Sequence, residues 1–358
     1  MTIGLLGSCL DANPAKTAAV TSCRQETGLR FLWFASLMKT RTKVILGVIA
    51  AVVLIGPFAI PVETSGDLTN KEAAALSWDG ESQFVDIADH SVHLVTKGDP
   101  ASDTLIVLLH GFGASALTWK DVLEPLSAVG LVVAYDRAAF GFTERPTKIG
   151  DINPYSSAGQ LRVLDEIVEK YGDQKKVVVL GHSAGGSIAL SYALDNPTKV
   201  DQLILEAPAV YGSGGAPEWL NWVFDIPQLN HLGPLAVSSI ATSGLQILDQ
   251  SYYNKDLITD QVRNNYTAPL AVIGWERAFW EFNKAPRSLD LVDRLIELNV
   301  ETLIITGDND EIVATSDSVQ LSSELLGSTL EIVTDSGHLP NEEQPAKFVE
   351  LVIGFLAK

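Results

Sequence analysis

A short apolar run at residues 177–180 leads directly into Gly-His-Ser-Ala-Gly-Gly, which places a serine at position 183, and helical spacing follows from residue 187. An uninterrupted run of β-branched and apolar residues is typical of a strand that is buried on both faces. The glycines permit a turn so tight that Ser183 is held in a strained conformation with its oxygen exposed. The following helix directs its first N–H groups toward that oxygen. The sequence therefore predicts a strand, a sharp turn and a helix, with Ser183 as a candidate nucleophile.

The alternation of strands and helices extends through most of the chain after residue 84. Strands are predicted at residues 84–88, 92–96, 105–109, 131–135, 177–180, 203–205, 303–306 and 330–333. Helices are predicted at residues 156–171, 187–194, 288–299, 316–326 and 345–356. The first two strands alternate in period two and predict a hairpin, whereas the later runs are continuously apolar. We therefore expect an α/β fold whose mostly parallel, eight-stranded sheet has helices on both faces.

Residues 212–286 interrupt this alternation. They contain no convincing strand, and helical spacing recurs at 256–266 and 270–282. A connection of this length between two strands is far longer than an ordinary loop. We expect an inserted helical cap over one end of the sheet, whose aromatic residues together favour an apolar acyl or alcohol group as ligand. These residues are Trp219, Trp222, Phe224, Tyr252, Tyr253, Trp275, Phe279 and Trp280.

A run without charged residues extends from Val44 to Ile60, with basic residues before it and acidic residues after it. Its length is at the short end of what crosses a bilayer, about 17–25 residues. Because positive residues tend to stay cytoplasmic, we expect an uncleaved single-pass signal anchor with the catalytic domain on the non-cytoplasmic side. A cleaved signal peptide followed by secretion is an alternative, and a buried helix of a soluble protein is another.

These patterns predict the domain organisation of the chain. We expect a cytoplasmic segment at 1–43, the anchor at 44–62, a linker at 63–83, a first part of the core at 84–211, the cap at 212–286 and a second part of the core at 287–358. Met38, basic residues and the apolar run would together make an ordinary start of a chain, so residues 1–37 are a candidate mis-called extension that is not part of the native protein.

Charge and cysteine content exclude several classes of protein. Lys and Arg number 25 against 44 Asp and Glu, and the net charge of −19 argues against nucleic acid as a partner. Both cysteines, Cys9 and Cys23, precede the apolar run. The main domain therefore cannot use a thiol nucleophile, a cysteine-bound metal or an internal disulfide.

A serine hydroxyl needs a general base, and in parallel sheets such groups lie at the carboxyl ends of strands. His338 follows the last predicted strand in a loop of turn-forming residues near the C-terminus, and it is the candidate base. His182 is next to Ser183, so we expect its side chain to point away from the site and pack.

The base in turn needs a carboxylate to hold its tautomer. The turn after residues 303–306 contains several acidic residues, of which we choose Asp310. Asp308 is the second choice, and Glu206 at the end of strand 203–205 is the third.

A developing oxyanion needs two fixed N–H donors. The backbone N–H of Ala184 is one candidate, since it begins the helix after the serine. The N–H of Phe112 is the other, because it lies in His110-Gly111-Phe112-Gly113 directly after strand 105–109.

The segments HGFG, DRAAFGFTERP, GHSAGG, GDNDEIV and SGHLPNEEQP resemble motifs of α/β-hydrolases, of the branch with a helical cap inserted after the sixth strand. The resemblance covers residues 84–358. It implies that Asp310 is the acid, since it lies at the family's Gly-x-x-Asp spacing. It also implies that Asp136 and Arg137 are structural and brace the loop beside the pocket.

The chain also departs from some relatives. Ala138 and Ala139 stand where relatives often have a glycine. Relatives that cleave carbon–halogen bonds or epoxides have aspartate in place of Ser183, which argues against both activities. Serine-dependent carbon–carbon hydrolases share the fold, but this chain does not resemble them at the serine turn, where they have methionine in place of Ala184.

The resulting hypothesis is a membrane-anchored serine hydrolase that cleaves carboxylic esters of apolar, lipid-derived substrates. Ser183, His338 and Asp310 form its catalytic triad, and no metal or organic cofactor is required. Another serine-dependent activity on the same fold is the alternative: a thioesterase, an amidase, a carbon–carbon bond hydrolase or an acyltransferase. A binding protein without catalytic activity is a further one.

Overall fold

The computed structural model describes residues 40–62, 65–78, 81–212, 221–238 and 240–358, with the side chains of residues 221 and 240–243 left out. The chain forms two compact units, Met1–Ile60 and Pro61–Lys358. In the first unit, helix α2 (Thr40–Ile55) continues into a 3-10 turn, η1 (Gly56–Ala59), and none of the residues of α2 is buried. Together they are long and apolar enough to cross a membrane. The predicted anchor thus coincides with a helix, and its insertion into a membrane stays a prediction.

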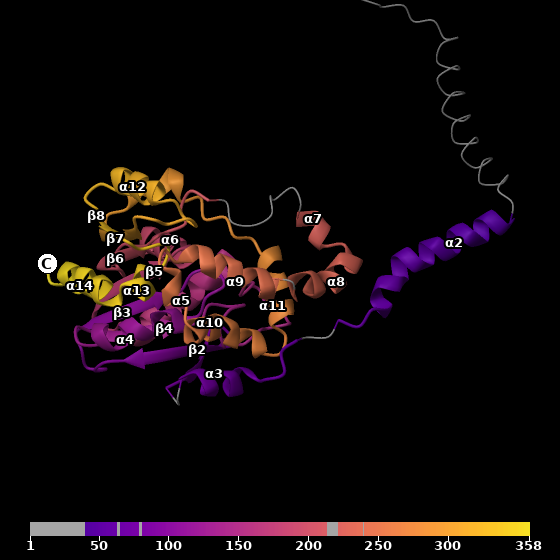
Figure 1. The fold of residues 1–358 in the computed structure, drawn as a ribbon, viewed down its shortest axis with the longest axis horizontal. Helices are drawn as coiled ribbons and strands as arrows, with labels where there is room; N and C mark the ends of the chain where they lie inside the picture. The colour runs from indigo at the N-terminus through magenta and orange to yellow at the C-terminus, as the bar shows by residue number, and fades with distance from the viewer. Residues whose placement is uncertain (1–39, 63–64, 79–80, 213–220, 239) are drawn as a thin grey trace, which may run out of the picture. The chain divides into compact units, whose positions relative to one another are not determined.

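Eight strands form one sheet in the second unit, as predicted (Figure 1). Their order across the sheet is β1-β2-β4-β3-β5-β6-β7-β8. The pairs β1–β2 and β2–β4 are antiparallel, and all other neighbouring pairs are parallel. The predicted hairpin and mostly parallel sheet are therefore confirmed. The strands are β1 (Gln83–Ile87), β2 (His90–Lys97), β3 (Thr104–Leu109), β4 (Leu131–Tyr135), β5 (Lys176–His182), β6 (Gln202–Glu206), β7 (Glu301–Gly307) and β8 (Thr329–Val333).

Side chains of the strands alternate between two apolar cores, one on each face of the sheet. Val107 and Val179 belong to the first core, and their chain neighbours Leu108 and Val178 belong to the second. Burial of both faces accounts for the continuously apolar strand sequences. The first face is covered by α5 (Ser157–Tyr171), α6 (Ala184–Asp195) and α12 (Thr315–Glu324), and the second by α3 (Asn70–Trp78), α4 (Lys120–Leu126) and α14 (Pro345–Leu356).

The predicted helix at 288–299 is wrong. Residues Val292–Glu297 form only a 3-10 turn, η6. Asp290 has a φ of 46°, in the left-handed region, so a right-handed helix cannot pass through it. Short 3-10 turns also occur at η2 (Ala116–Trp119) and η4 (Lys255–Leu257), and a four-residue helix, α13 (Pro340–Glu343), follows the last strand.

Between β6 and β7, the described residues contain helices and no strand of the sheet. Of the predicted helices, the one at 256–266 is α10, and the one at 270–282 is divided by Gly274, whose φ is 80°. Trp219 lies outside the described residues. The elements of this inserted segment are α7 (Asn221–Phe224), α8 (Pro227–Ser238), α9 (Ile240–Ser251), α10 (Asp260–Thr267), η5 (Ala268–Ala271) and α11 (Trp275–Lys284).

Residues 65–68, which we name the N-terminal strap, attach to the inserted segment. Ser65 donates from its backbone N and from its Oγ to one carboxylate oxygen of Glu276, both at 2.6 Å, and accepts from Trp275 Nε1 at 2.9 Å. Leu68 donates to the carbonyl of Ala271 at 3.0 Å. Glu276 and Trp275 are both buried, so the strap supplies hydrogen-bond partners to one carboxylate oxygen and to the indole N–H in the interior of the inserted segment.

Candidate active site

Ser183 lies in the predicted sharp turn between β5 and α6. Its backbone has φ 51° and ψ −119°, a combination that residues with a side chain rarely adopt. Glycine is required on both sides: a Cβ on Gly181 would lie 2.5 Å from the Gly185 carbonyl oxygen, and one on Gly185 would lie 2.5 Å from that of Leu109. The backbone N of Ser183 donates to the carbonyl of Glu206 at 2.8 Å, which fastens the turn to β6.

His338 and Asp310 meet at the ends of β8 and β7. His338 Nδ1 lies 2.7 Å from Asp310 Oδ2, and both side chains are buried. The other carboxylate oxygen of Asp310 accepts from the backbone N–H groups of Ile312 at 2.8 Å and Val313 at 2.9 Å. Because Nδ1 faces a carboxylate it carries the ring proton, which leaves Nε2 free to accept one. His338 is therefore arranged as a general base.

The two other candidate acids do not contact His338 through any hydrogen bond of the described residues. Asp308 is exposed, and its carboxylate accepts from the backbone N of Ser336 at 3.3 Å. Glu206 is fully buried and accepts from the backbone N of Asn341 at 2.8 Å. Burial raises the pKa of Glu206 well above its ordinary value, which disfavours the charged form of this carboxyl.

The expectation that His182 points away from the site is wrong. Its Nε2 donates to the backbone carbonyl of His338 at 3.0 Å, and the two rings lie 4.6 Å apart between centroids. Burial, followed by the charge of His338, lowers the pKa of His182 well below its ordinary value. His182 therefore stays neutral and holds the loop that carries His338.

The loop after β3 lies beside Ser183. The carbonyl of Gly111 accepts from His110 Nδ1 at 2.8 Å and from Arg137 Nη2 at 2.9 Å. In a trans peptide the next N–H, that of Phe112, points in the opposite direction from this carbonyl. A Cβ on Gly111 would lie 3.2 Å from Ser183 Cβ, so the loop passes directly beside the serine.

Buried polar residues fix this loop, as the resemblance implied for Asp136 and Arg137. Asp136 accepts from His93 Nδ1 at 2.8 Å and from two backbone N–H groups at 2.6 Å. Burial would raise the pKa of Asp136, but His93 and these donors hold it below its ordinary value. Burial also lowers the pKa of His110 to about 3, which keeps its ring neutral. Ala139 has a φ of 75°, which explains why relatives often have glycine at this point.

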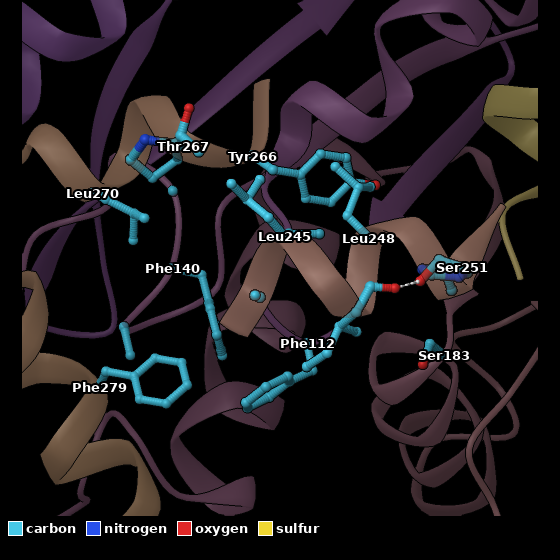
Figure 2. Close-up of a pocket in the computed structure, with 18 of the residues that line it drawn as sticks. Phe112, Phe140, Ser183, Leu245, Leu248, Ser251, Tyr266, Thr267, Leu270 and Phe279 are labelled. Atoms are coloured by element: carbon cyan, nitrogen blue, oxygen red, sulfur yellow. Dashed lines mark hydrogen bonds between the residues drawn. The ribbon is translucent and has the colours of Figure 1, made fainter. Parts of the chain in front are cut away.

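One pocket contains Ser183, His182 and His338 and extends away from them between the inserted segment and the loops of the core (Figure 2). Its volume is about 1170 Å³, including its open mouth. The hydroxyls of Tyr266, Thr267 and Ser251 line the pocket but already donate within the protein. The apolar part of the wall comprises Phe112, Phe140, Leu245, Leu248, Leu270 and Phe279, among others.

Sequence reasoning did not identify all of these residues. Leu245 and Leu248 lie on α9, for which no helical pattern was identified, and Phe140 was noticed only as part of a motif. Among the described residues, no group of three or more His, Cys, Asp or Glu side chains could hold a metal ion.

A parallel sheet with a serine turn after β5, an aspartate after β7 and a histidine after β8 defines the α/β-hydrolase fold. A model of the alpha/beta hydrolase family matches residues 106–351, which is more than half of the chain. The chain therefore belongs to this family.

Several known proteins are similar to the chain. It is 27% identical over 280 residues to 2-hydroxy-6-oxo-2,4-heptadienoate hydrolase of Pseudomonas putida, and the match covers 75% of this chain and 92% of that protein. A solved meta-cleavage product hydrolase of Pseudomonas fluorescens is 26% identical, with a TM-score of 0.58, over 77% of this chain and 97% of that one. The enol-lactonase of Burkholderia xenovorans has a TM-score of 0.62 over 77% of this chain and 100% of that one; at 18% identity it shows the fold alone.

Proposed function

We propose that the protein is a serine hydrolase that cleaves carboxylic esters of apolar substrates through an acyl-enzyme. The observation that carries the proposal is the buried pair of His338 and Asp310, of which His338 lines the same pocket as the strained Ser183. Backbone strain held at a nucleophile, together with an oriented histidine, is the arrangement that activates a serine hydroxyl.

The reaction proceeds in two halves. Ser183 Oγ attacks the acyl carbonyl carbon while Nε2 of His338 takes the hydroxyl proton, and the imidazolium is stabilised by Asp310. The negative oxygen of the tetrahedral intermediate accepts from the N–H groups of Phe112 and Ala184. His338 then gives its proton to the departing alcohol. Water attacks the acyl-enzyme, again losing a proton to His338, which returns it to Ser183 as the acid leaves.

The pocket supports an apolar acyl or alcohol group as the part of the substrate that is bound. Most of its lining side chains are apolar, and the hydroxyls on its wall are engaged in internal hydrogen bonds. Desolvating a polar substrate group against the apolar part of the wall, without a partner, would cost about 1–3 kcal/mol. Arg145 is the charged arginine among the lining residues. A lipid-derived ester fits this chemistry, and no cofactor takes part in the steps above.

A second candidate is a carbon–carbon bond hydrolase, and similarity is the observation that favours it. The relatives described above include hydrolases named for a dienoate and for meta-cleavage products. The same serine, histidine and oxyanion donors would serve such a reaction. The two candidates differ in the group that must be bound, since a dienoate has a carboxylate.

Kinetics of the full-length protein would separate these candidates. We would compare a chain-length series of aryl esters with 2-hydroxy-6-oxo-2,4-heptadienoate, using Ser183→Ala as the control. Turnover of the esters that disappears in Ser183→Ala supports the esterase, and the preferred chain length gives the size of the pocket. Turnover of the dienoate without turnover of the esters would favour the carbon–carbon bond hydrolase over the esterase. Equal background rates in the wild type and in Ser183→Ala, for the esters and for the dienoate, would refute both candidate functions.

We further propose that α2 and η1 anchor the protein in a membrane through the run from Val44 to Ile60, with the hydrolase unit on the non-cytoplasmic side. The length and composition of Thr40–Ala59 support this, as do the basic residues before it. Protease added outside intact and permeabilised cells provides the test. Protection of the hydrolase unit even after the outer envelope is opened would show that the orientation is wrong.

A further inference from the structure

Helix α9 forms part of the pocket wall and also reaches the loop that carries His338. Leu245, Leu248 and Ser251 all line the pocket, and Figure 2 shows them with Ser183 around the same space. A substrate bound beside Ser183 would therefore touch α9. The other contacts of α9 decide whether such a substrate contact can affect the position of His338.

The end of α9 is bonded directly to the backbone around His338. The backbone N of His338 donates to the carbonyl of Ser251 at 2.7 Å. Leu339, the next residue, packs in one apolar cluster with Leu248 and Tyr252. A Cβ on Gly337 would lie 2.5 Å from the Ser251 carbonyl oxygen, so the two backbones are in close contact. Any shift of the end of α9 must move His338 or break these contacts.

Glu342 and Glu343 lie on α13, which follows the loop of His338. Their carboxylates accept a second set of hydrogen bonds, and we name these two residues the carboxylate clamp. Glu343 accepts from the backbone N of Gly337 at 2.6 Å with one oxygen and from that of Asn254 at 3.0 Å with the other. It thereby joins the His338 loop to the residues just after α9.

Glu342 joins three elements. It accepts from Tyr252 OH at the C-terminal side of α9 at 2.5 Å, from Tyr266 OH on α10 at 2.6 Å, and from Thr118 Oγ1 on η2. Burial raises the pKa of Glu342, and the three hydroxyl donors act against that rise. Hydrogen bonds to a carboxylate are stronger than those between neutral groups. This half-buried residue therefore firmly connects the inserted segment and the core.

We propose that Glu342 and Tyr252 are positioning residues: their hydrogen bond couples α9, and hence the filling of the pocket, to the placement of His338. The inference rests on the proposed serine-hydrolase function and names a determinant of its specificity. A substrate long enough to press on Leu245 and Leu248 holds α9, and through the clamp His338, in the reactive position. A short substrate leaves α9 unsupported, so the advantage of a long acyl chain lies in the rate of the chemical step as well as in binding.

Tyr252 offers a clean perturbation. Its ring packs with Leu248 and Leu339, and it is not among the residues that line the pocket. Tyr252→Phe removes only the hydroxyl. Tyr211→Phe is a matched control, because Tyr211 OH also donates to a glutamate, Glu324, at 2.7 Å, and neither residue lines the pocket.

The experiment measures covalent labelling of the full-length protein by an ethyl and a decyl fluorophosphonate. Ser183 Oγ bonds to phosphorus, the P–F bond breaks, fluoride leaves and the serine proton passes to His338, so the labelling rate reports the placement of the base. We expect the maximal rate, kinact, to be higher for the decyl probe in the wild type. Tyr252→Phe and Glu342→Gln should lower kinact for the decyl probe by about tenfold, with little change for the ethyl probe or in KI. Tyr211→Phe should behave as the wild type.

Each other outcome has a definite meaning. Variants in which only KI changes, in which both probes lose rate equally, or in which Tyr211→Phe has the same effect would overturn the coupling. A wild type that neither probe labels, or labelling that persists in Ser183→Ala, would instead refute the proposed serine-hydrolase function. The coupling would then be tested by the turnover of the dienoate in the same variants: an unchanged kcat in Tyr252→Phe and Glu342→Gln would refute it, and a lowered kcat would support it.

Discussion

The strained backbone of Ser183 leads to a prediction about stability that is independent of the substrate. The backbone at this residue, φ 51° and ψ −119°, crowds any Cβ atom. Such strain costs about 1–3 kcal/mol. Alanine keeps the Cβ and so keeps the strain, whereas glycine relieves it. Glycine in turn loses about 0.5–1 kcal/mol because it has more freedom in the unfolded chain.

The balance favours glycine. We expect Ser183→Gly to be more stable than Ser183→Ala by about 1 kcal/mol, or about 2 °C in Tm for a domain of this size. Urea unfolding of the full-length protein, followed by tryptophan fluorescence, would measure the difference. Both variants lose the hydroxyl, so neither should turn over an ester.

Ser318 provides the control. It is buried within α12, where the backbone is an ordinary helix, and there glycine should be less stable than alanine by about 0.5–1 kcal/mol. The predicted order of the two substitutions is therefore opposite at the two serines. If Ser183→Ala equals or exceeds Ser183→Gly in stability, the argument from backbone strain is wrong.

Three further predictions concern the acid, the pH dependence and the turn. Asp310→Asn should lower kcat/KM about 10⁴-fold and Asp308→Asn only a few-fold, as measured by ester hydrolysis; equal losses would contradict the contact with His338 as the decisive one. The pKa of His110 is about 3 in the fold and 6.5 in its ordinary state, so the unfolded chain takes up a proton first and stability falls as the pH drops below 6.5. His110 should account for a loss of about 2 kcal/mol in the free energy of unfolding between pH 7 and pH 5. Urea titrations of His110→Gln should therefore show a free energy of unfolding that depends less on pH. Gly185→Ala should destabilise the fold by about 2 kcal/mol or more, since its Cβ would lie 2.5 Å from two carbonyl oxygens, and an unchanged urea midpoint would contradict this.

The sequence predicted most reliably those features whose cause is local. The strand, the glycines and the helix around Ser183 are contiguous, so one short pattern contains the whole turn. The positions of Asp310 and His338 follow from a general rule, because the carboxyl ends of parallel strands meet at one edge of the sheet. The structure brings Asp310, rather than Asp308, against His338.

Features that depend on distant residues were not predictable in this way. The orientation of His182 follows from the loop of His338, which lies 156 residues later in the chain. Glu342 is one of two adjacent glutamates, and only the fold shows that its carboxylate accepts from Tyr252 and Tyr266. The 3-10 turn at η6 has suitable apolar spacing for a helix, but a left-handed residue before it prevents one.

The N-terminal strap determines where a shortened, soluble form of the protein can begin. A chain that starts after Leu68 would leave a carboxylate oxygen of Glu276 without its two donors and Trp275 Nε1 without its acceptor, all in the interior. Leaving such buried groups unpaired costs about 1–3 kcal/mol each. The family match begins at residue 106, yet we expect a shortened form to keep its full stability only if it extends back at least to Ser65.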